Sequence, residues 1–560
     1  MTAQGHGAVP RAKWTAPSGK PPLSSRMMRA TWRGLPPEQH EVGWEPGLVV
    51  PAADGSPLLT DHYFPRTAGD FPTLVVRSPY GRGVPWSPQY GMLFAEQGFH
   101  VVLQSCRGTG GSGGRFDLWR NEPADGQATV SWLREQPWFN GTLGTIGPSY
   151  LGYVQWALAL DPPPELKAMV VQVGLHDPCA LFHTDGVLHL ENALLDGLGM
   201  TYQHRGAMPS LKAMLRLQRG WRKVVTARPL RGAHTSVLGE VPWLDGVMAH
   251  PDSGDPYWDG ADLGKAAERL RVPTALITGW HDALAEQTFE QYGRLRAAGC
   301  ETSLLVGTWT HTSALQRGWP EVFAESLAWL RAHLCDDPSG LRPTPVRVHV
   351  AGEETWRELE EWPPSHGTAP WFPTADGHLT RQPSVDSAPL TSFRYDPADP
   401  TPSVGGPLLS RTAGARDNRA LEAREDVLTF TGPVLTEPLD VLGPVVARWA
   451  ISTDTGYADV FARLCDVDAQ GRSTNVCDGL GRLRTAGQEL AEVTVPMGHT
   501  AHRFAAGHRI RLQVSGGAHP RYARQSGTGE SAVEASSLEP VRITLHAGSA
   551  LALPLGAAGA

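Results

Sequence analysis

Short apolar runs alternate with stretches of helical spacing over the first third of the chain. The apolar runs that predict strands are 73–80, 100–108, 144–147 and 167–174, and the stretches that predict helices are 90–98, 125–138 and 150–160. Before them, the Asp54-Gly55 pair predicts the turn of a hairpin within residues 48–64. This alternation is typical of a mostly parallel sheet with helices on both faces.

The pattern changes between residues 176 and 271, where Leu, Met and Arg recur in long helical stretches. These residues predict a helical insertion that lies over the sheet as a cap. Strand-like runs resume at 273–282 and 303–311, and a helix at 322–334 closes this part of the chain.

After a Pro- and Gly-rich stretch at 337–345, short alternating runs separated by turn signals predict an all-β sandwich, in the form of a jelly roll. The predicted domains are a disordered basic tail at 1–35, an α/β domain at 36–175 and 272–336, a helical cap at 176–271 and the jelly roll at 345–556.

Composition excludes several classes of protein. A net charge of −8 over 560 residues argues against a general nucleic-acid binder. The chain has no apolar run of about 18 residues, which predicts no membrane span. The basic N-terminal stretch lacks the apolar core of a secretory signal, so we expect a cytoplasmic protein, with an organelle transit peptide as the alternative. Six dispersed cysteines, without a C-x-x-C pair or metal spacing, predict reduced thiols and neither metal nor cofactor.

A glycine-rich loop follows the apolar run at 100–108. Gly108, Gly110 and Gly113 fit the spacing G-x-G-x-x-G. A dinucleotide site also needs a helix to begin at this point, but turn residues and a proline follow, and the Gly-Lys-Ser/Thr of a P-loop is absent. The loop is therefore interpreted as a flexible surface loop.

Ser149 lies between the apolar run that ends at Gly147 and the helical stretch that begins at Tyr150. A serine at the apex of a strand–turn–helix projects its hydroxyl from the sheet edge, where the first backbone N–H groups of the helix also point. The sequence G-P-S-Y-L-G departs from G-x-S-x-G because its second glycine, Gly152, comes one position late. The residues around Ser149 leave a nucleophile and an ordinary glycine-rich loop equally open.

A serine nucleophile needs a base that is oriented by a carboxylate. Asp282 and His311 follow the next two apolar runs, in the order Ser, Asp, His expected on a parallel sheet. Taken singly, Asp282 could be a helix N-cap and His311 a surface residue. Their shared order and position favour a catalytic set. His281 is a rival base, but adjacent residues in an extended turn point in different directions.

The oxyanion of an acyl-transfer intermediate also needs hydrogen-bond donors. The backbone N–H of Tyr150, directly after Ser149, is one candidate. A second donor must come from a loop after an earlier strand, where the hydroxyl of Tyr80 could reach. A packing role is the alternative for Tyr80.

These residues belong to motifs that resemble the cocaine esterase and X-prolyl dipeptidyl-peptidase family of serine hydrolases, and within it the cocaine esterases most closely. The motifs are SPYGRG, QSCRGTGGSGGRF, GTIGPSYLGYVQW, ITGWHDAL, VGTWTH, RYDPADPTPSVGG and GHRIRLQVS, between about Val49 and about Leu555. The resemblance implies an α/β-hydrolase core with a helical cap and a C-terminal jelly roll.

The resemblance also implies roles for single residues. Ser149 would be the nucleophile, His311 the general base and Asp282 its orienting acid, with an oxyanion hole made by Tyr80 and Tyr150. Two positions of the substrate pocket carry over, Gln89 and Leu284. The cap segment has diverged from the cocaine esterase pattern. Arg82 stands where related α-amino-acid ester hydrolases carry an acidic residue, which favours neutral or anionic acyl groups.

The sequence therefore predicts a serine hydrolase that cleaves small-molecule carboxylic esters, or amides, through an acyl-enzyme. An acyltransferase or an X-prolyl-type peptidase with the same triad is the enzymatic alternative. A carbohydrate-binding jelly-roll protein with an inert core is the non-enzymatic one. We expect neither nucleic-acid nor membrane partners, and a homodimer is one assembly that the sequence allows.

Overall fold

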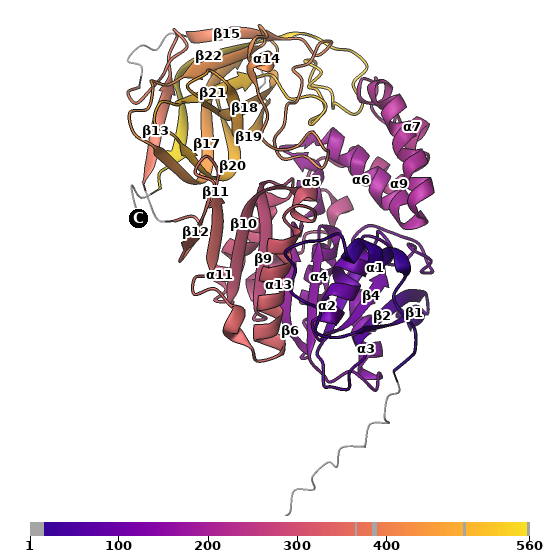
Figure 1. Ribbon diagram of the computed structural model, residues 1–560. Helices are drawn as coiled ribbons and strands as arrows, with labels where there is room; N and C mark the ends of the chain where they lie inside the picture. Colours follow the sequence, from indigo (N-terminus) through magenta and orange to yellow (C-terminus); the bar gives the residue numbers. More distant parts are fainter. Residues whose placement is uncertain (1–15, 365–366, 384–388, 485–488, 557–560) are drawn as a thin grey trace, which may run out of the picture.

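The computed structural model describes residues 16–364, 367–383, 389–484 and 489–556. An α/β half and a β-rich half lie end to end, and helices α6, α7 and α9 rise beside the junction between them (Figure 1).

One mixed sheet forms the centre of the α/β half. Among the described residues it has ten strands in the order β1-β2-β4-β3-β5-β6-β9-β10-β11-β12. Every neighbouring pair from β4 to β11 is parallel, and the pairs β1–β2, β2–β4 and β11–β12 are antiparallel. The bounds are β1 (Val42–Pro51), β2 (Pro57–Pro65), β3 (Thr73–Ser78), β4 (His100–Ser105), β5 (Leu143–Pro148), β6 (Leu166–Gln172), β9 (Thr274–His281), β10 (Thr302–Thr310), β11 (Val346–Val350) and β12 (Thr355–Leu359). The predicted hairpin and parallel sheet are confirmed.

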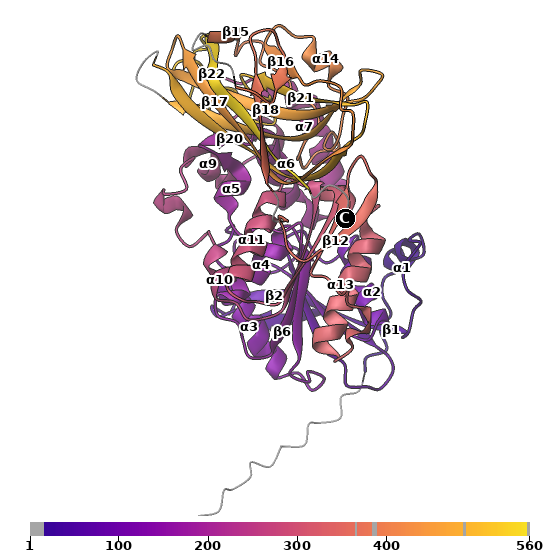
Figure 2. The same ribbon diagram turned by 90° about the vertical axis from the view of Figure 1, so that its left-hand side faces the viewer.

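Helices cover both faces of this sheet (Figure 2). One face carries α3 (Glu122–Arg134), α4 (Tyr150–Ala159), α10 (Gly264–Arg269) and α11 (Ala285–Ala297). The other face carries η1 (Ser87–Met92), α2 (Leu93–Glu96) and α13 (Trp319–Leu334). All ten residues of α4 are buried, as expected for a helix that is apolar on all sides. The α/β-hydrolase core is confirmed.

Residues 176–271, predicted as the cap, consist mainly of helices. All of these helices lie over the carboxyl ends of the strands except α10, which packs beside α4 and α11 on the sheet face, so the cap ends before α10. The other helices are α5 (Pro178–Phe182), α6 (Leu190–Tyr202), α7 (Ala207–Val225), α8 (Thr235–Leu238) and α9 (Pro242–Ala249), with the short turns η2 (Gln203–Arg205) and η3 (Pro256–Trp258). A small hairpin that the sequence pattern did not predict, β7 (His183–Thr184) and β8 (Val187–Leu188), separates α5 from α6.

The β-rich half is a sandwich of two antiparallel sheets. In its described residues the larger sheet has β13 (Thr368–Pro373), β14 (Leu379–Thr380), β15 (Pro389–Tyr395), β17 (Leu439–Thr453), β20 (Ala491–Phe504) and β22 (Val541–Pro554), and the smaller sheet has β16 (Val427–Thr431), β18 (Tyr457–Val467), β19 (Ser473–Arg484) and β21 (Arg509–Ser515). Alternate residues of both sheets meet in one apolar core around Trp449. The C-terminal jelly roll is confirmed.

Two predicted boundaries differ from the structure. Residues 1–15 lie outside the described residues, but the rest of the predicted tail is ordered in part: Leu23–Arg29 form helix α1, and Arg29 pairs with Glu96 at 2.8 Å. β11 and β12, which were assigned to the jelly roll, continue the α/β sheet, because Leu304–Val306 of β10 pair in parallel with Val346–Val348. The alternating burial of β11 reflects its place near the sheet edge rather than a sandwich.

Candidate active site

Ser149 occupies a strained turn between β5 and α4. Its φ of 57° and ψ of −124° lie where a side chain is unfavourable, so the surrounding structure must impose this conformation. The Ser149 backbone N–H is bound by the carbonyl oxygens of Gln172 at 2.9 Å and Val173 at 3.1 Å, in and just after β6. The turn therefore has the backbone of a nucleophile elbow.

The late glycine has a packing reason. A Cβ on Gly152 would lie 2.9 Å from the Gly174 Cα, so α4 can approach β6 only with glycine here. Leu151 instead packs over Gly147, where a Cβ would come within 2.4 Å of the Leu151 Cβ. The spacing G-P-S-Y-L-G thus fits a tight contact between α4 and β6.

Asp282 and His311 are hydrogen-bonded to each other. Asp282 follows β9, and its Oδ1 lies 2.7 Å from Nδ1 of His311, the first residue of α12 (His311–Ala314) after β10. Asp282 also accepts a hydrogen bond from the Thr278 hydroxyl at 2.8 Å and from the Leu284 backbone N–H at 3.1 Å. These bonds fix the carboxylate, which in turn orients the imidazole.

Burial alone would lower the pKa of His311, but the Asp282 carboxylate, by charge and by hydrogen bond, outweighs it, with a further contribution from Asp196. The net result is a raised pKa. A histidine in this setting is a stronger base than an isolated imidazole, as a proton acceptor from serine requires.

The Tyr80 hydroxyl lies 3.5 Å from Ser149 Oγ. Its ring stacks on Trp86, with centroids 5.4 Å apart and planes 19° apart. Burial, and after it the charge of Asp196, raises the pKa of Tyr80, while the Ser149 hydroxyl and the Tyr150 backbone N–H act on the same hydroxyl in the opposite direction. Tyr80 is therefore a neutral donor beside Ser149 Oγ and the Tyr150 N–H.

The structure thus brings Ser149, Tyr80 and Tyr150 into one group, and His311 and Asp282 into a hydrogen-bonded pair. Both groups lie at the carboxyl ends of the parallel strands β3, β5, β9 and β10, where sites of such sheets form. His281 is directed elsewhere: it lines a cavity of about 260 Å³ between the two halves of the molecule, together with His502 and Asp466. Burial lowers its pKa to about 4.

Two sequence-based interpretations change here. The glycine-rich loop is pinned rather than flexible, because Ser112 Oγ accepts from the Leu59 N–H at 2.8 Å and donates to the Ser105 carbonyl at 2.9 Å. Arg82 pairs with Asp61 at 3.1 Å and binds the hydroxyl of Ser105 at 2.6 Å. Its guanidinium is engaged within the protein, so it gives no support to an anionic acyl group.

Comparison with known proteins decides the family. Residues 54–313 match the X-Pro dipeptidyl-peptidase (S15) family, and residues 340–552 match the C-terminal non-catalytic domain of X-Pro dipeptidyl-peptidases. The chain is 32% identical over 536 residues to a cocaine esterase of Rhodococcus sp. (strain MB1 Bresler), covering 86% of this chain and 92% of the relative. The chain belongs to the S15 family.

Solved structures agree with this fold. An aminopeptidase from a marine sediment Thaumarchaeota archaeon superposes with a TM-score of 0.80 at 21% identity, over 93% of this chain and 98% of the other. A selenomethionine-labelled α-amino acid ester hydrolase gives a TM-score of 0.77 at 22% identity, with the same coverage. The shared fold therefore extends over almost the whole chain.

Gln89 and Leu284, the two pocket positions implied by the S15 resemblance, are both buried. Gln89 Nε2 donates to the carbonyl of Leu315, just after α12, at 2.7 Å. Leu284 gives its backbone N–H to Asp282. In this structure Leu284 helps to fix the Asp282 carboxylate, and Gln89 is bound to the segment just after α12. Their contact with substrate stays a prediction.

Sequence reasoning missed Asp196. It lies on α6 of the cap, and its Oδ2 is buried without a hydrogen-bond partner among the described residues. Burial raises its pKa to about 7, and His311 counteracts this rise. Because only the packing of the cap brings α6 over the sheet, no local motif marked this residue.

The described residues contain no group of three or more His, Cys, Asp or Glu side chains suited to a metal. Nor does any helix in the described ranges have the length and apolarity to cross a bilayer. All six cysteines lie in these ranges and are free thiols.

Proposed function

We propose that this S15 protein cleaves carboxylic esters of small molecules through an acyl-enzyme formed on Ser149. The observation that carries the proposal is the approach of the Tyr80 hydroxyl to within 3.5 Å of Ser149 Oγ at a strained elbow. Two residues that are distant in sequence thus place a nucleophile, Ser149, beside a proposed oxyanion donor, Tyr80. The hydrogen-bonded pair of His311 and Asp282 supplies the base.

In the acylation step, His311 takes the proton from Ser149 while Oγ bonds to the carbonyl carbon. Asp282 stabilises the imidazolium that forms. The carbonyl oxygen, now an oxyanion, accepts hydrogen bonds from the Tyr80 hydroxyl and the Tyr150 backbone N–H. Collapse breaks the bond to the leaving alcohol, which receives the proton from His311.

Deacylation repeats these steps with water in place of serine. His311 takes one proton from water, the hydroxide oxygen bonds to the acyl carbon, and the same two donors bind the second oxyanion. Collapse releases the carboxylic acid and returns the proton to Ser149. No external cofactor enters this balance.

The matched proteins suggest the substrate class. The Rhodococcus relative is a cocaine esterase, which favours small-molecule esters. The family description also names X-Pro dipeptidyl-peptidases, so amide or peptide cleavage is the second candidate. We further propose that the protein acts in the cytoplasm, in keeping with its six free thiols, and a homodimer is to be tested by its mass in solution.

The proposal is tested with Ser149→Ala. The wild type should hydrolyse short p-nitrophenyl esters and be labelled by a fluorophosphonate, and the variant should lose both. Ser131→Ala, on the outer side of α3, is the matched control and should retain both. Hydrolysis that persists in Ser149→Ala would exclude Ser149 as the nucleophile. Product analysis with added amine or alcohol acceptors distinguishes hydrolysis from acyl transfer.

A further inference from the structure

The side chain of Tyr150 is held by hydrogen bonds below the elbow. Its ring is buried, with 2% of the residue exposed. Its hydroxyl donates to Oε1 of Glu122 at 3.1 Å and accepts from the Trp119 backbone N–H at 2.9 Å. Burial, followed by the charge of Glu122, raises the pKa of Tyr150 well above its usual value, so the hydroxyl stays a donor. The first residue of α4 is thus anchored through its side chain, directly after Ser149, whose backbone N–H is bound to the carbonyl oxygens of Gln172 and Val173.

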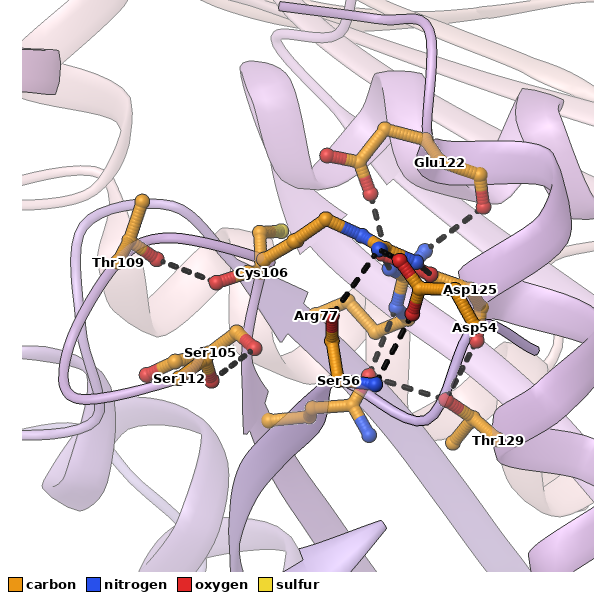
Figure 3. Close-up of polar contacts among 12 residues, drawn as sticks. Asp54, Ser56, Arg77, Ser105, Cys106, Thr109, Ser112, Glu122, Asp125 and Thr129 are labelled. Carbon is orange, nitrogen blue, oxygen red and sulfur yellow. Dashed lines mark hydrogen bonds and ion pairs between the residues drawn. The ribbon is translucent and has the colours of Figure 1, made fainter. Parts of the chain in front are cut away.

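The other oxygen of Glu122 pairs with Arg77, and both side chains are 3% exposed. Arg77 Nη2 lies 2.9 Å from Glu122 Oε2, and Arg77 Nη1 donates to the Glu122 carbonyl at 3.0 Å. Arg77 Nε donates to Gln104 Oε1 at 2.9 Å. Figure 3 shows Arg77 facing Glu122 and Asp125 from the sheet below. The guanidinium is therefore bound on three sides.

A further ion pair supports this group. Arg107, at the start of the glycine-rich loop, donates hydrogen bonds to the Asp125 carboxylate from Nη2 at 2.5 Å and from Nε at 3.1 Å. Asp125 Oδ2 in turn lies 3.8 Å from Arg77 Nη2. Burying such charges has a large desolvation cost, and apolar residues of similar volume would often stabilise a fold as well. Its residues are therefore candidates for a geometric role in addition to filling the core.

The positions of Arg77 and Glu122 indicate what this role is. Arg77 lies on β3, three residues before Tyr80, and Glu122 binds the residue whose backbone N–H follows Ser149. One continuous path, Tyr150–Glu122–Arg77, therefore joins the two proposed oxyanion donors through the buried side of the sheet edge. A shift at either end would change the separation between the Tyr80 hydroxyl and the Tyr150 N–H.

We propose that Glu122 and Arg77 are positioning residues that set the spacing of the oxyanion hole by clamping the Tyr150 phenol. This inference rests on the proposed hydrolase function of the site. Neither residue touches substrate in this scheme. Their effect reaches the reaction through the Tyr150 backbone N–H and the strand that carries Tyr80.

The test is Tyr150→Phe, which keeps the ring and the backbone N–H but removes the hydroxyl from Glu122. Tyr153→Phe is the matched control, because Tyr153 lies on the same helix, is fully buried and donates its hydroxyl to the Ala261 carbonyl at 2.9 Å instead. Active sites are counted by complete reaction with a fluorophosphonate. The values of kcat and KM for a p-nitrophenyl ester and the affinity for a trifluoromethyl ketone, which forms a tetrahedral oxyanion on serine, are then expressed per active site.

Tyr150→Phe should lower kcat roughly 10- to 100-fold, since small misplacements of catalytic groups have effects of this size. The trifluoromethyl ketone should lose affinity by a similar factor, and KM should not change, because the ground state makes little use of the oxyanion hole. Tyr153→Phe should change none of these values per active site. Glu122→Gln should lower kcat and ketone affinity together in the same way.

Equal kcat and ketone affinity per active site in Tyr150→Phe and wild type would overturn the proposal, even if the variant contained fewer active sites, because that result is a folding effect alone. If Tyr150→Phe does not fold, Glu122→Gln decides by the same criterion. Failure of the hydrolase function itself looks different: the wild type would then not be labelled, or Ser149→Ala would retain activity.

Discussion

Removal of the Tyr80 hydroxyl is the most direct test of the oxyanion hole. In Tyr80→Phe the ring should stay stacked on Trp86, so the pocket keeps its shape and KM should not change. The resting contact of 3.5 Å with Ser149 Oγ is long for a hydrogen bond. In the proposed mechanism the hydroxyl gains its strong acceptor only when the substrate's carbonyl oxygen becomes an oxyanion beside it. The hydroxyl thus acts mainly in the transition state, and its loss should appear in kcat.

The expected magnitude follows from the number of donors. With two proposed donors, Tyr80→Phe leaves the Tyr150 backbone N–H in place, so the variant loses one. Loss of one donor lowers kcat by about 100- to 1,000-fold, or about 2.7–4 kcal/mol of transition-state stabilisation. Because the raised pKa keeps Tyr80 protonated, the loss should be the same across the neutral pH range.

The assay is steady-state hydrolysis of p-nitrophenyl acetate, normalised by active-site titration. Tyr63→Phe is the control, because Tyr63 is also buried but its hydroxyl is hydrogen-bonded to the Ser87 hydroxyl at 2.7 Å rather than to Ser149. A fall in kcat of less than about 10-fold in Tyr80→Phe, or an effect confined to KM, would show that Tyr80 is a packing residue.

Three further changes have definite expected outcomes. Asp282→Asn should lower kcat by about 10,000-fold, because an amide cannot stabilise the imidazolium or hold His311 in the required tautomer. An unchanged kcat in the same ester assay would show that Asp282 is not part of the triad. Asp196→Asn should move the acidic limb of the pH profile of kcat/KM to lower pH. His311 must be neutral to act, and the charge of Asp196 contributes to its raised pKa, so loss of that charge should lower the pKa of His311. An acidic limb that does not move would contradict this coupling. Gly152→Ala should reduce the free energy of unfolding, measured by urea titration, by about 1–3 kcal/mol, because the added methyl group would clash with the Gly174 backbone. A variant as stable as the wild type would show that α4 can shift to make room for the methyl group.

Where local signals coincide with topology, the sequence indicated which residues the structure places at one edge of the sheet. Ser149, Asp282 and His311 each follow an apolar run, and the carboxyl ends of parallel strands meet at one edge, so their order along the chain was informative. The late Gly152 was ambiguous, because its reason is a contact with Gly174 that no local pattern records.

The errors have the same cause. The glycine-rich loop looked mobile because its bonds go to Leu59 and Pro57, about fifty residues away. β11 alternates like a sandwich strand, and only its pairing with β10 places it in the α/β sheet. Asp196 has no motif because the cap fold alone brings it near His311. Each of these features depends on partners distant in sequence.

The extension of the α/β sheet to β11 also joins the two halves of the molecule through the main chain. The Ala351 N–H donates to the Ala501 carbonyl at 3.0 Å, and the Arg503 N–H donates back to the Ala351 carbonyl at 2.8 Å. Arg503 also pairs with Glu353 at 2.9 Å. A truncated enzyme cut before residue 345 would expose the edge of β10 as a template for aggregation. Chimaeras that exchange the C-terminal domain should therefore keep residues up to 359 with the α/β parent and preserve the partners of Ala351.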